Sequence, residues 1–217
     1  MSKILALIFD LDGTLIDTEN HILTSFRHAT KTVLGVSPPD EVMRNMIGIP
    51  LADQMRKVSP DHVAELLAVY REFNAASCEK LVKEFPSMAE TLDKLKEAGY
   101  RLAVVTSKQT PSALRDLGLT GLIESFELIQ GSDKTERHKP EPEPLLAAAA
   151  TMGLAPEQCA YIGDSTYDMQ AARAANMLAV AALWGMFSRE RLLEAGAQVQ
   201  AATITCLPAL FNDLNAT

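Results

Sequence analysis

Short apolar runs alternate along most of the chain with longer stretches in which apolar and polar residues recur at helical spacing. The runs cover residues 4–9, 102–106, 126–129, 160–162 and 178–183. Because nearly every position in a run is apolar, both faces of each strand are expected to be buried, as in a parallel sheet covered by helices. Amphipathic helices are predicted between the later runs, over residues 87–100, 110–119, 142–154 and 165–177. This alternation predicts an α/β fold, doubly wound, with a mainly parallel Rossmann-like core.

The region between residues 15 and 85 breaks the alternation. It contains no strand-like run, and Pro and Gly residues divide it into four predicted helices, over residues 19–35, 38–48, 50–58 and 60–85. A helical block of about 70 residues, inserted after the first strand, is large enough to be a smaller second domain. We therefore predict a catalytic core formed by residues 1–14 and 86–217, and an inserted helical cap domain formed by residues 15–85.

Composition narrows the class of protein. The chain has 217 residues, of which 47% are apolar and 22% charged, as is usual for a folded domain. A net charge of −8 argues against nucleic acid or an anionic membrane as the main partner. No apolar run has the length of a membrane span or resembles a signal peptide, and three scattered cysteines indicate neither disulfides nor a zinc site. We expect a cytoplasmic monomer or homodimer that acts on a small molecule.

Polar residues follow the predicted strands at the points where the strands end. In an open α/β sheet these carboxyl ends line the ligand crevice, so side chains from different strands are expected to meet there. Two carboxylates placed two positions apart behind an apolar strand repel each other unless a cation lies between them. The residues at this edge are Asp10, Asp12, Thr106, Ser107, Lys139, Asp164 and Asp168.

This set of residues meets the requirements of phosphoryl transfer. An aspartate such as Asp10 can attack phosphorus and form an acyl phosphate, which divides one difficult step into two. Asp12 can then protonate the leaving oxygen and later activate water. Mg²⁺ binds carboxylate and phosphate oxygens and would relieve the repulsion between Asp10 and Asp164. Lys139 and Thr106 can hold the transferring phosphoryl oxygens, with the backbone N–H of Ser107. No role is predicted for the side chain of Lys108.

Four segments carry a resemblance to a known family: "DLDGT" (10–14), "VVTSK" (104–108), "KPEP" (139–142) and "GDSTYD" (163–168). In this order, and with the helical insertion, they resemble the phosphohydrolases of the haloacid dehalogenase superfamily. The resemblance implies a Rossmann-like core, a mobile helical cap, Asp10 as the nucleophile and Mg²⁺ as the cofactor. It further implies that the metal is held by the carboxylate of Asp10, the backbone carbonyl of Asp12 and Asp164. Asp168 is expected to act on the metal through water or Lys139, with direct ligation as the alternative.

The acid at position 12 narrows the resemblance. Haloacid dehalogenases proper lack an acid there and cation-pumping ATPases have Thr, so the chain resembles the phosphoglycolate phosphatase group instead. It is most similar to the PpaX-type pyrophosphatases, through "TSFRHA", "MIGIPL", "YREFN", "LVKEF" and "HKPEPEPLL". The predicted activity is hydrolysis of a small phosphate compound, and both phosphoglycolate and pyrophosphate remain open as substrates.

Two other functions use similar chemistry. A β-phosphoglucomutase-like enzyme has the same cap and nucleophile, but members of that branch usually carry Glu where this chain has Gly163. A receiver-type signalling domain also phosphorylates an Asp, but its acceptor follows a middle strand and it has no cap. Both differences favour hydrolysis, and the mutase remains the stronger alternative.

Substrate preference is expected to depend on the segment "RNMIGIPL" (44–51). Gly48 and Pro50 interrupt the predicted cap helices, so this loop can reach toward the crevice. Arg44 and Arg56 flank the loop and are expected to meet an anionic leaving group, with solvated surface positions as the alternative.

Overall fold

The computed structural model describes residues 2–216, and its core is one parallel sheet of six strands. The strand order is β5-β4-β1-β6-β7-β8, and each neighbouring pair is parallel. The strands are β1 (Ala6–Phe9), β4 (Arg101–Val105), β5 (Leu128–Gln130), β6 (Cys159–Gly163), β7 (Leu178–Ala182) and β8 (Val199–Ala201). Every residue of β1, β6 and β7 is buried, as their apolar runs predicted. The predicted fold class is confirmed.

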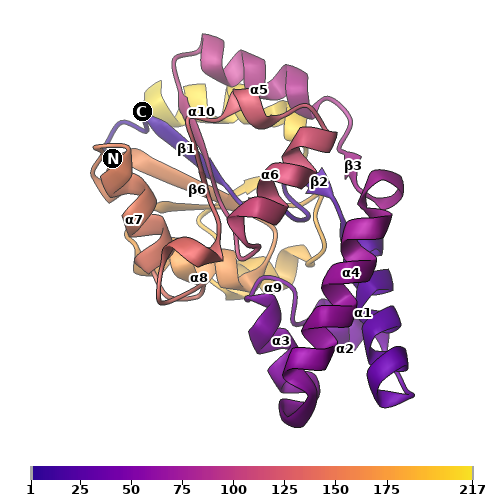
Figure 1. The fold of residues 1–217 in the computed structure, drawn as a ribbon. Coiled ribbons are helices and arrows are strands. Elements are labelled where there is room, and N and C mark those ends of the chain that lie inside the picture. Colours follow the sequence, from indigo (N-terminus) through magenta and orange to yellow (C-terminus); the bar gives the residue numbers. More distant parts are fainter. Residues whose placement is uncertain (1, 217) are drawn as a thin grey trace.

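Helices cover both faces of this sheet (Figure 1). Along β1, Leu7 and Phe9 face one hydrophobic cluster, and Ala6 and Ile8 face another. The first cluster is closed by α5 (Met88–Glu97), α6 (Thr110–Leu119) and α10 (Leu207–Ala216). The second is closed by α7 (Glu143–Thr151), α8 (Thr166–Ala174) and α9 (Arg189–Glu194). The described residues also contain five 3-10 turns: Pro60–His62, Ile123–Ser125, Ser132–Lys134, Pro156–Gln158 and Ile204–Cys206.

Four further helices lie beside the core and are called the cap helices below (Figure 1). They are α1 (Glu19–Leu34), α2 (Asp40–Arg44), α3 (Leu51–Val58) and α4 (Val63–Leu81), at the four predicted places. Their apolar faces form a third hydrophobic cluster around Phe26, Met55 and Leu66, which Met186 joins from the core. The division of the chain into two domains remains a prediction that this packing supports.

The cap helices are joined to the core by a two-stranded antiparallel ribbon. Its strands are β2 (Ile16–Asp17) and β3 (Lys83–Glu84), with Ile16 opposite Glu84 and Asp17 opposite Lys83. Strands of two residues have no hydrophobic pattern, so the sequence did not predict them. They lie beside the two predicted boundaries of the cap domain, at residues 15 and 85.

Cys78, Cys159 and Cys206 are free thiols. In the part of the chain from residue 2 to residue 216, no helix is both long and apolar enough to cross a bilayer.

Candidate active site

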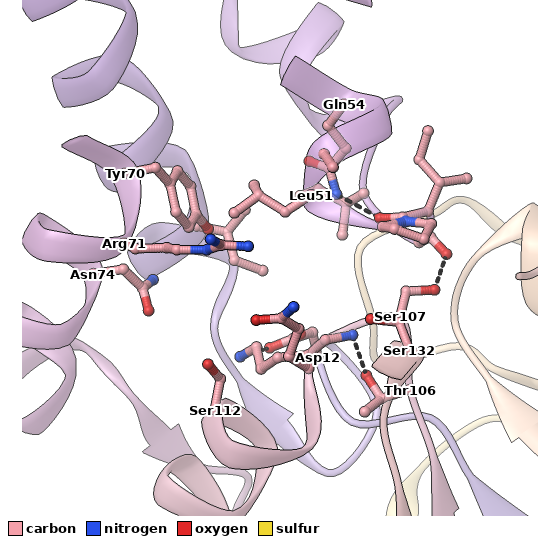
Figure 2. A pocket seen from close by; sticks show the side chains of 18 of the residues that line it. Asp12, Leu51, Gln54, Tyr70, Arg71, Asn74, Thr106, Ser107, Ser112 and Ser132 are labelled. Atoms are coloured by element: carbon pink, nitrogen blue, oxygen red, sulfur yellow. Dashed lines mark hydrogen bonds and ion pairs between the residues drawn. The ribbon is translucent and has the colours of Figure 1, made fainter. Parts of the chain in front are cut away.

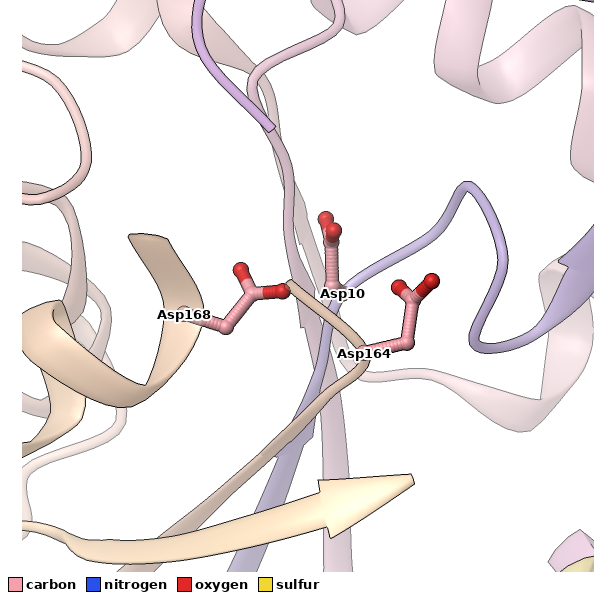
Figure 3. Close-up of side chains that lie close together, drawn as sticks. All are labelled: Asp10, Asp164 and Asp168. Atoms are coloured by element: carbon pink, nitrogen blue, oxygen red, sulfur yellow. The ribbon is translucent and has the colours of Figure 1, made fainter. Parts of the chain in front are cut away.

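Three strand ends bring the predicted catalytic groups together. Asp10 follows β1, Thr106 follows β4 and Asp164 follows β6. Because β1 lies between β4 and β6, with Phe9 beside both Val104 and Ile162, the next residues of all three strands emerge at one edge. Figure 3 shows the carboxylates of Asp10, Asp164 and Asp168 converging there.

The three carboxylates form a buried acidic cluster. One oxygen from each of Asp10, Asp164 and Asp168 lies within 4.8 Å of the others. Burial raises the pKa of Asp10 from 3.8 to about 7, although Lys139 opposes this rise. Burial, followed by the charge of Asp168, also raises the pKa of Asp164 well above its ordinary value. Burial and the neighbouring carboxylates therefore disfavour the ionised forms of Asp10 and Asp164.

Lys139 supplies the cation inside this cluster. Its buried Nζ lies 3.0 Å from Asp10 Oδ1 and 2.6 Å from Asp168 Oδ1, and it donates to the hydroxyl of Tyr161 at 3.0 Å. Burial alone would lower the pKa of Lys139, but Asp10 and Asp168 reverse this effect and raise it well above its ordinary value. The ammonium group is thus a fixed positive charge beside Asp10.

Asp168 is committed to protein partners through both oxygens. Oδ1 is paired with Lys139, and Oδ2 accepts from the backbone N–H and the hydroxyl of Ser165, at 2.9 and 2.7 Å. Ser165 in turn accepts from the backbone N–H of Asp168, which closes a capping box at the start of α8. This arrangement fits the predicted indirect role, in which Asp168 holds Lys139.

Asp164 is fixed by donors on both sides of its carboxylate. Oδ1 accepts from the hydroxyl of Thr14 at 3.0 Å, and Oδ2 accepts from the backbone N–H of Met186 at 2.8 Å. A Cβ on Gly13 would lie 2.3 Å from Oδ2, and one on Gly185 would lie 2.2 Å from the Cβ of Asp164. Glycine at both positions therefore leaves room for this carboxylate, and Gly13 also adopts a positive φ of 77°.

The donor set fits a hard divalent cation. Asp10 and Asp164 present buried carboxylate oxygens, and Asp10 Oδ1 is buried without a hydrogen-bond partner within residues 2–216, although Lys139 is near enough for an ion pair. Oxygen ligands of this kind suit Mg²⁺. Two of the residues predicted to hold Mg²⁺, Asp10 and Asp164, are therefore brought together.

A second cation lies near Asp12. The Nζ of Lys108 is 2.8 Å from Asp12 Oδ1 and 2.5 Å from Asp116 Oδ2, and the hydroxyl of Thr18 donates to Asp12 Oδ1 at 2.7 Å. No role was predicted for the Lys108 side chain, but the structure shows it largely buried against two carboxylates. The sequence could not show that α6 places Asp116 beneath it.

The core edge and the cap helices enclose a cavity of about 430 Å³. Figure 2 shows the two walls, with Leu51 and Gln54 on α3 and Tyr70, Arg71 and Asn74 on α4 facing the core. From the core come Asp10, Asp12, Thr106, Ser107, Lys108, Ser112, Arg115, Ser132 and His138. The predicted catalytic residues Asp10, Asp12 and Thr106 thus lie at the wall opposite the cap helices.

The three predicted specificity residues have different positions. Gly48 lines the cavity, has a φ of 111°, and its carbonyl accepts from the hydroxyl of Ser107 at 2.6 Å. Arg44 pairs with Glu19 at 2.6 Å, and Arg56 pairs with Asp53 on an exposed face. Neither arginine lines the cavity, so their positions agree with the alternative of solvated surface residues and not with the expected contact. Arg71, which the sequence reasoning did not select, is the cap arginine that does line it.

Fold and site together define a doubly wound α/β enzyme with a buried carboxylate centre under a helical cap. Residues 7–182 match the family model described as haloacid dehalogenase-like hydrolase. The chain belongs to this family, as its four motifs predicted.

Two individual relatives and one solved structure are similar to the chain over most of its length. The chain is 38% identical over 167 residues to the pyrophosphatase PpaX of Halalkalibacterium halodurans, covering 77% of this chain and 78% of that protein. It is 35% identical over 190 residues to the pyrophosphatase PpaX of Bacillus cereus strain AH820, covering 88% of each. A solved haloacid dehalogenase-like hydrolase from Streptococcus pneumoniae superposes with a TM-score of 0.87 at 31% identity, over 97% of this chain and 100% of that one.

Proposed function

We propose that the protein is a Mg²⁺-dependent phosphohydrolase that cleaves pyrophosphate through an aspartyl-phosphate intermediate. One observation carries the proposal: Asp10 lies 3.0 Å from the buried ammonium of Lys139, in a cavity that a cap arginine also lines. A carboxylate paired in this way, at a strand end and beside a second acid, suits nucleophilic attack on phosphorus. The relatives named pyrophosphatase support the choice of substrate.

The first step transfers the phosphoryl group to the protein. A carboxylate oxygen of Asp10 attacks phosphorus, the bond from phosphorus to the leaving oxygen breaks, and Asp12 gives its proton to that oxygen. Lys139 and the hydroxyl of Thr106 stabilise the negative charge on the phosphoryl oxygens. Mg²⁺, held by Asp10, Asp164 and the Asp12 carbonyl, would supply further positive charge and favour the ionised form of Asp10.

The second step regenerates the enzyme. Asp12, now a carboxylate, takes a proton from water while the water oxygen attacks phosphorus. The bond between phosphorus and Asp10 breaks, and inorganic phosphate leaves. The cap helices exclude bulk water during the first step and must admit one water for the second.

Charge in the cavity supports an anionic leaving group. Lys108 and Arg115 are both paired with carboxylates, whereas Arg71 forms no ion pair with any residue between 2 and 216. Its guanidinium extends from α4 into the cavity (Figure 2). The distal phosphate of pyrophosphate would neutralise it, and so would the carboxylate of phosphoglycolate, which is the second candidate substrate.

Gly163 gives a structural reason to prefer hydrolysis over mutase chemistry. The β-phosphoglucomutase-like enzymes usually carry Glu at this position. A Cβ on Gly163 would lie 2.5 Å from both Cβ and Cγ of Asp168, so a larger side chain would displace the partner of Lys139.

A turnover screen tests the proposal. Purified protein is assayed with pyrophosphate, phosphoglycolate and β-glucose 1-phosphate, with and without Mg²⁺, alongside the Asp10→Asn variant. We expect the highest kcat/KM with pyrophosphate, reversible loss with chelator, and a phosphorylated protein detectable by mass after acid quenching in the wild type alone. Higher kcat/KM with phosphoglycolate would replace the substrate, and turnover by folded Asp10→Asn would remove the mechanism.

A further inference from the structure

The carboxylate of Asp12 is held by donors that come from two different parts of the chain. Thr18, at the start of the first cap helix, donates to Oδ1 at 2.7 Å, and the Nζ of Lys108 lies 2.8 Å from the same oxygen. The side chains of Asp12 and Lys108 are each 14% exposed, so this ion pair is largely shielded from solvent. A shielded pair of this kind fixes a side chain more firmly than a surface pair does.

Asp116 fixes Lys108 from below. Its side chain is fully buried, with Oδ2 2.5 Å from Lys108 Nζ and Oδ1 accepting from Arg115 Nε at 2.8 Å. Burial alone would raise the pKa of Asp116, but Lys108 and Arg115 lower it below its ordinary value. A buried carboxylate without these partners would be strongly destabilised, so the pairing of Asp116 with Lys108 is favoured. This pairing holds the ammonium group of Lys108 in place.

Arg115 extends the same network to the cap helices. Its Nη2 donates to Asn74 Oδ1 at 2.9 Å, and the buried side chain of Asn74 also donates to the hydroxyl of Ser25 on α1. The chain of contacts therefore runs from Asp12 through Lys108, Asp116 and Arg115 to α4.

We propose that Lys108 is a positioning residue for Asp12, and that Asp116, Arg115 and Asn74 link this position to the placement of the cap helices. The inference rests on the acid–base role given to Asp12 under the proposed function. Two carboxylates already compensate the charge of Lys108, so it is not available as a primary substrate cation in the way that Arg71 is. Its task is to keep the Asp12 carboxyl at the place where the leaving oxygen departs.

The position of the Asp12 carboxyl should have a measurable effect on the reaction rate. General acid catalysis contributes roughly 10²- to 10⁴-fold, and a displacement of about 1 Å can remove on the order of 10²-fold. Loss of Lys108 should therefore slow reactions that need a proton on the leaving oxygen. A substrate whose leaving oxygen needs no proton should be far less affected.

The experiment compares Lys108→Met with the wild type in single-turnover phosphorylation of Asp10, using pyrophosphate and p-nitrophenyl phosphate. We expect a loss of about 10- to 100-fold with pyrophosphate and less than about threefold with the aryl ester, with KM for pyrophosphate nearly unchanged. Lys108→Arg should recover part of the loss. Equal losses on both substrates, or an effect confined to KM, would show that Lys108 contacts the substrate and would overturn the proposal.

A double-mutant cycle separates positioning from other roles. In the Asp12→Asn background, Lys108→Met should cause almost no further loss, because the group that it positions is already absent. Additive losses would contradict the proposal. If Asp12→Asn alone keeps full activity with pyrophosphate, the acid role in the proposed function fails first, and this inference fails with it.

Two controls protect the test against a folding defect. Lys94→Met removes an exposed lysine that pairs with Glu90 on α5, and should leave both rates unchanged. If Lys108→Met is unstable because Asp116 loses a partner, the double variant Lys108→Met with Asp116→Asn removes both charges and should show the same difference between the two substrates. A double variant that folds and treats both substrates alike would also overturn the proposal.

Discussion

The core side and the cap side of the cavity differ in how their charged groups are paired. On the core side, Asp10, Lys139 and Asp168 are almost fully buried and satisfy one another through contacts of 2.6 to 3.0 Å. On the cap side, α3 and α4 present apolar surface and a few polar groups, of which the guanidinium of Arg71 carries the uncompensated charge. Under the proposed function, the core wall would hold the phosphoryl group that every candidate substrate shares. We expect discrimination between substrates to depend on the cap wall.

The largest expected effect is on the core wall. Asp10→Asn should lower kcat by at least about 10³-fold, because the amide cannot form the aspartyl phosphate, while circular dichroism stays unchanged. Steady-state phosphate release measures the effect. Near-normal turnover in the folded variant would remove the difference between the walls, since the core would then not carry the chemistry.

The same substitution should have the opposite effect on stability without metal. The pKa of Asp10 in the folded protein is about 7, above its ordinary 3.8. Stability from the protonated carboxyl is therefore full below pH 4 and lost as the pH rises through 7. In chelator, Asp10→Asn should raise the free energy of unfolding at pH 8, by as much as roughly 4 kcal/mol relative to its effect at pH 4. Urea denaturation at both values measures this, and an effect independent of pH would contradict it.

Replacement of Asp164 should weaken the binding of Mg²⁺. Asp164→Ala removes a predicted ligand, so the affinity for Mg²⁺ should fall at least roughly tenfold and activity should recover in part at high Mg²⁺. Isothermal titration calorimetry measures the affinity. Asp93→Ala, an exposed aspartate paired with Lys96, is the control that should leave it unchanged. Calcium should substitute poorly, because it prefers a larger coordination shell.

The smallest expected effect lies on the cap wall and is selective. Arg71→Met should lower kcat/KM for pyrophosphate about tenfold, as expected when a charge-assisted hydrogen bond is lost, and leave p-nitrophenyl phosphate nearly unaffected. Arg56→Met removes a cap arginine outside the cavity and should change neither substrate. If both variants lower pyrophosphate turnover equally, the cap wall acts through overall charge and not through a specific contact.

The sequence revealed the core better than the cap. Five of the six strands were predictable because each coincides with a short apolar run, whereas the edge strand β8 (Val-Gln-Ala) contains no such run. Asp10, Thr106 and Asp164 could be grouped because parallel strands end at one edge. Lys108 could not be assigned, because its position depends on a buried aspartate on α6. Arg71 could not be selected, because it lies within a predicted helix and the sequence does not show which face of that helix lines the cavity.

The ribbon of β2 and β3 bears on whether the cap helices can be replaced by those of a relative. Both chain crossings between the core and the cap helices pass through one pair of two-residue strands, with Asp17 opposite Lys83. The ends of the insertion are therefore already adjacent, so the core needs no long loop to close when the inserted length changes. We therefore expect the cap helices to be exchangeable, so that a chimaera cut at these two residues would combine one relative's cavity wall with another's catalytic edge.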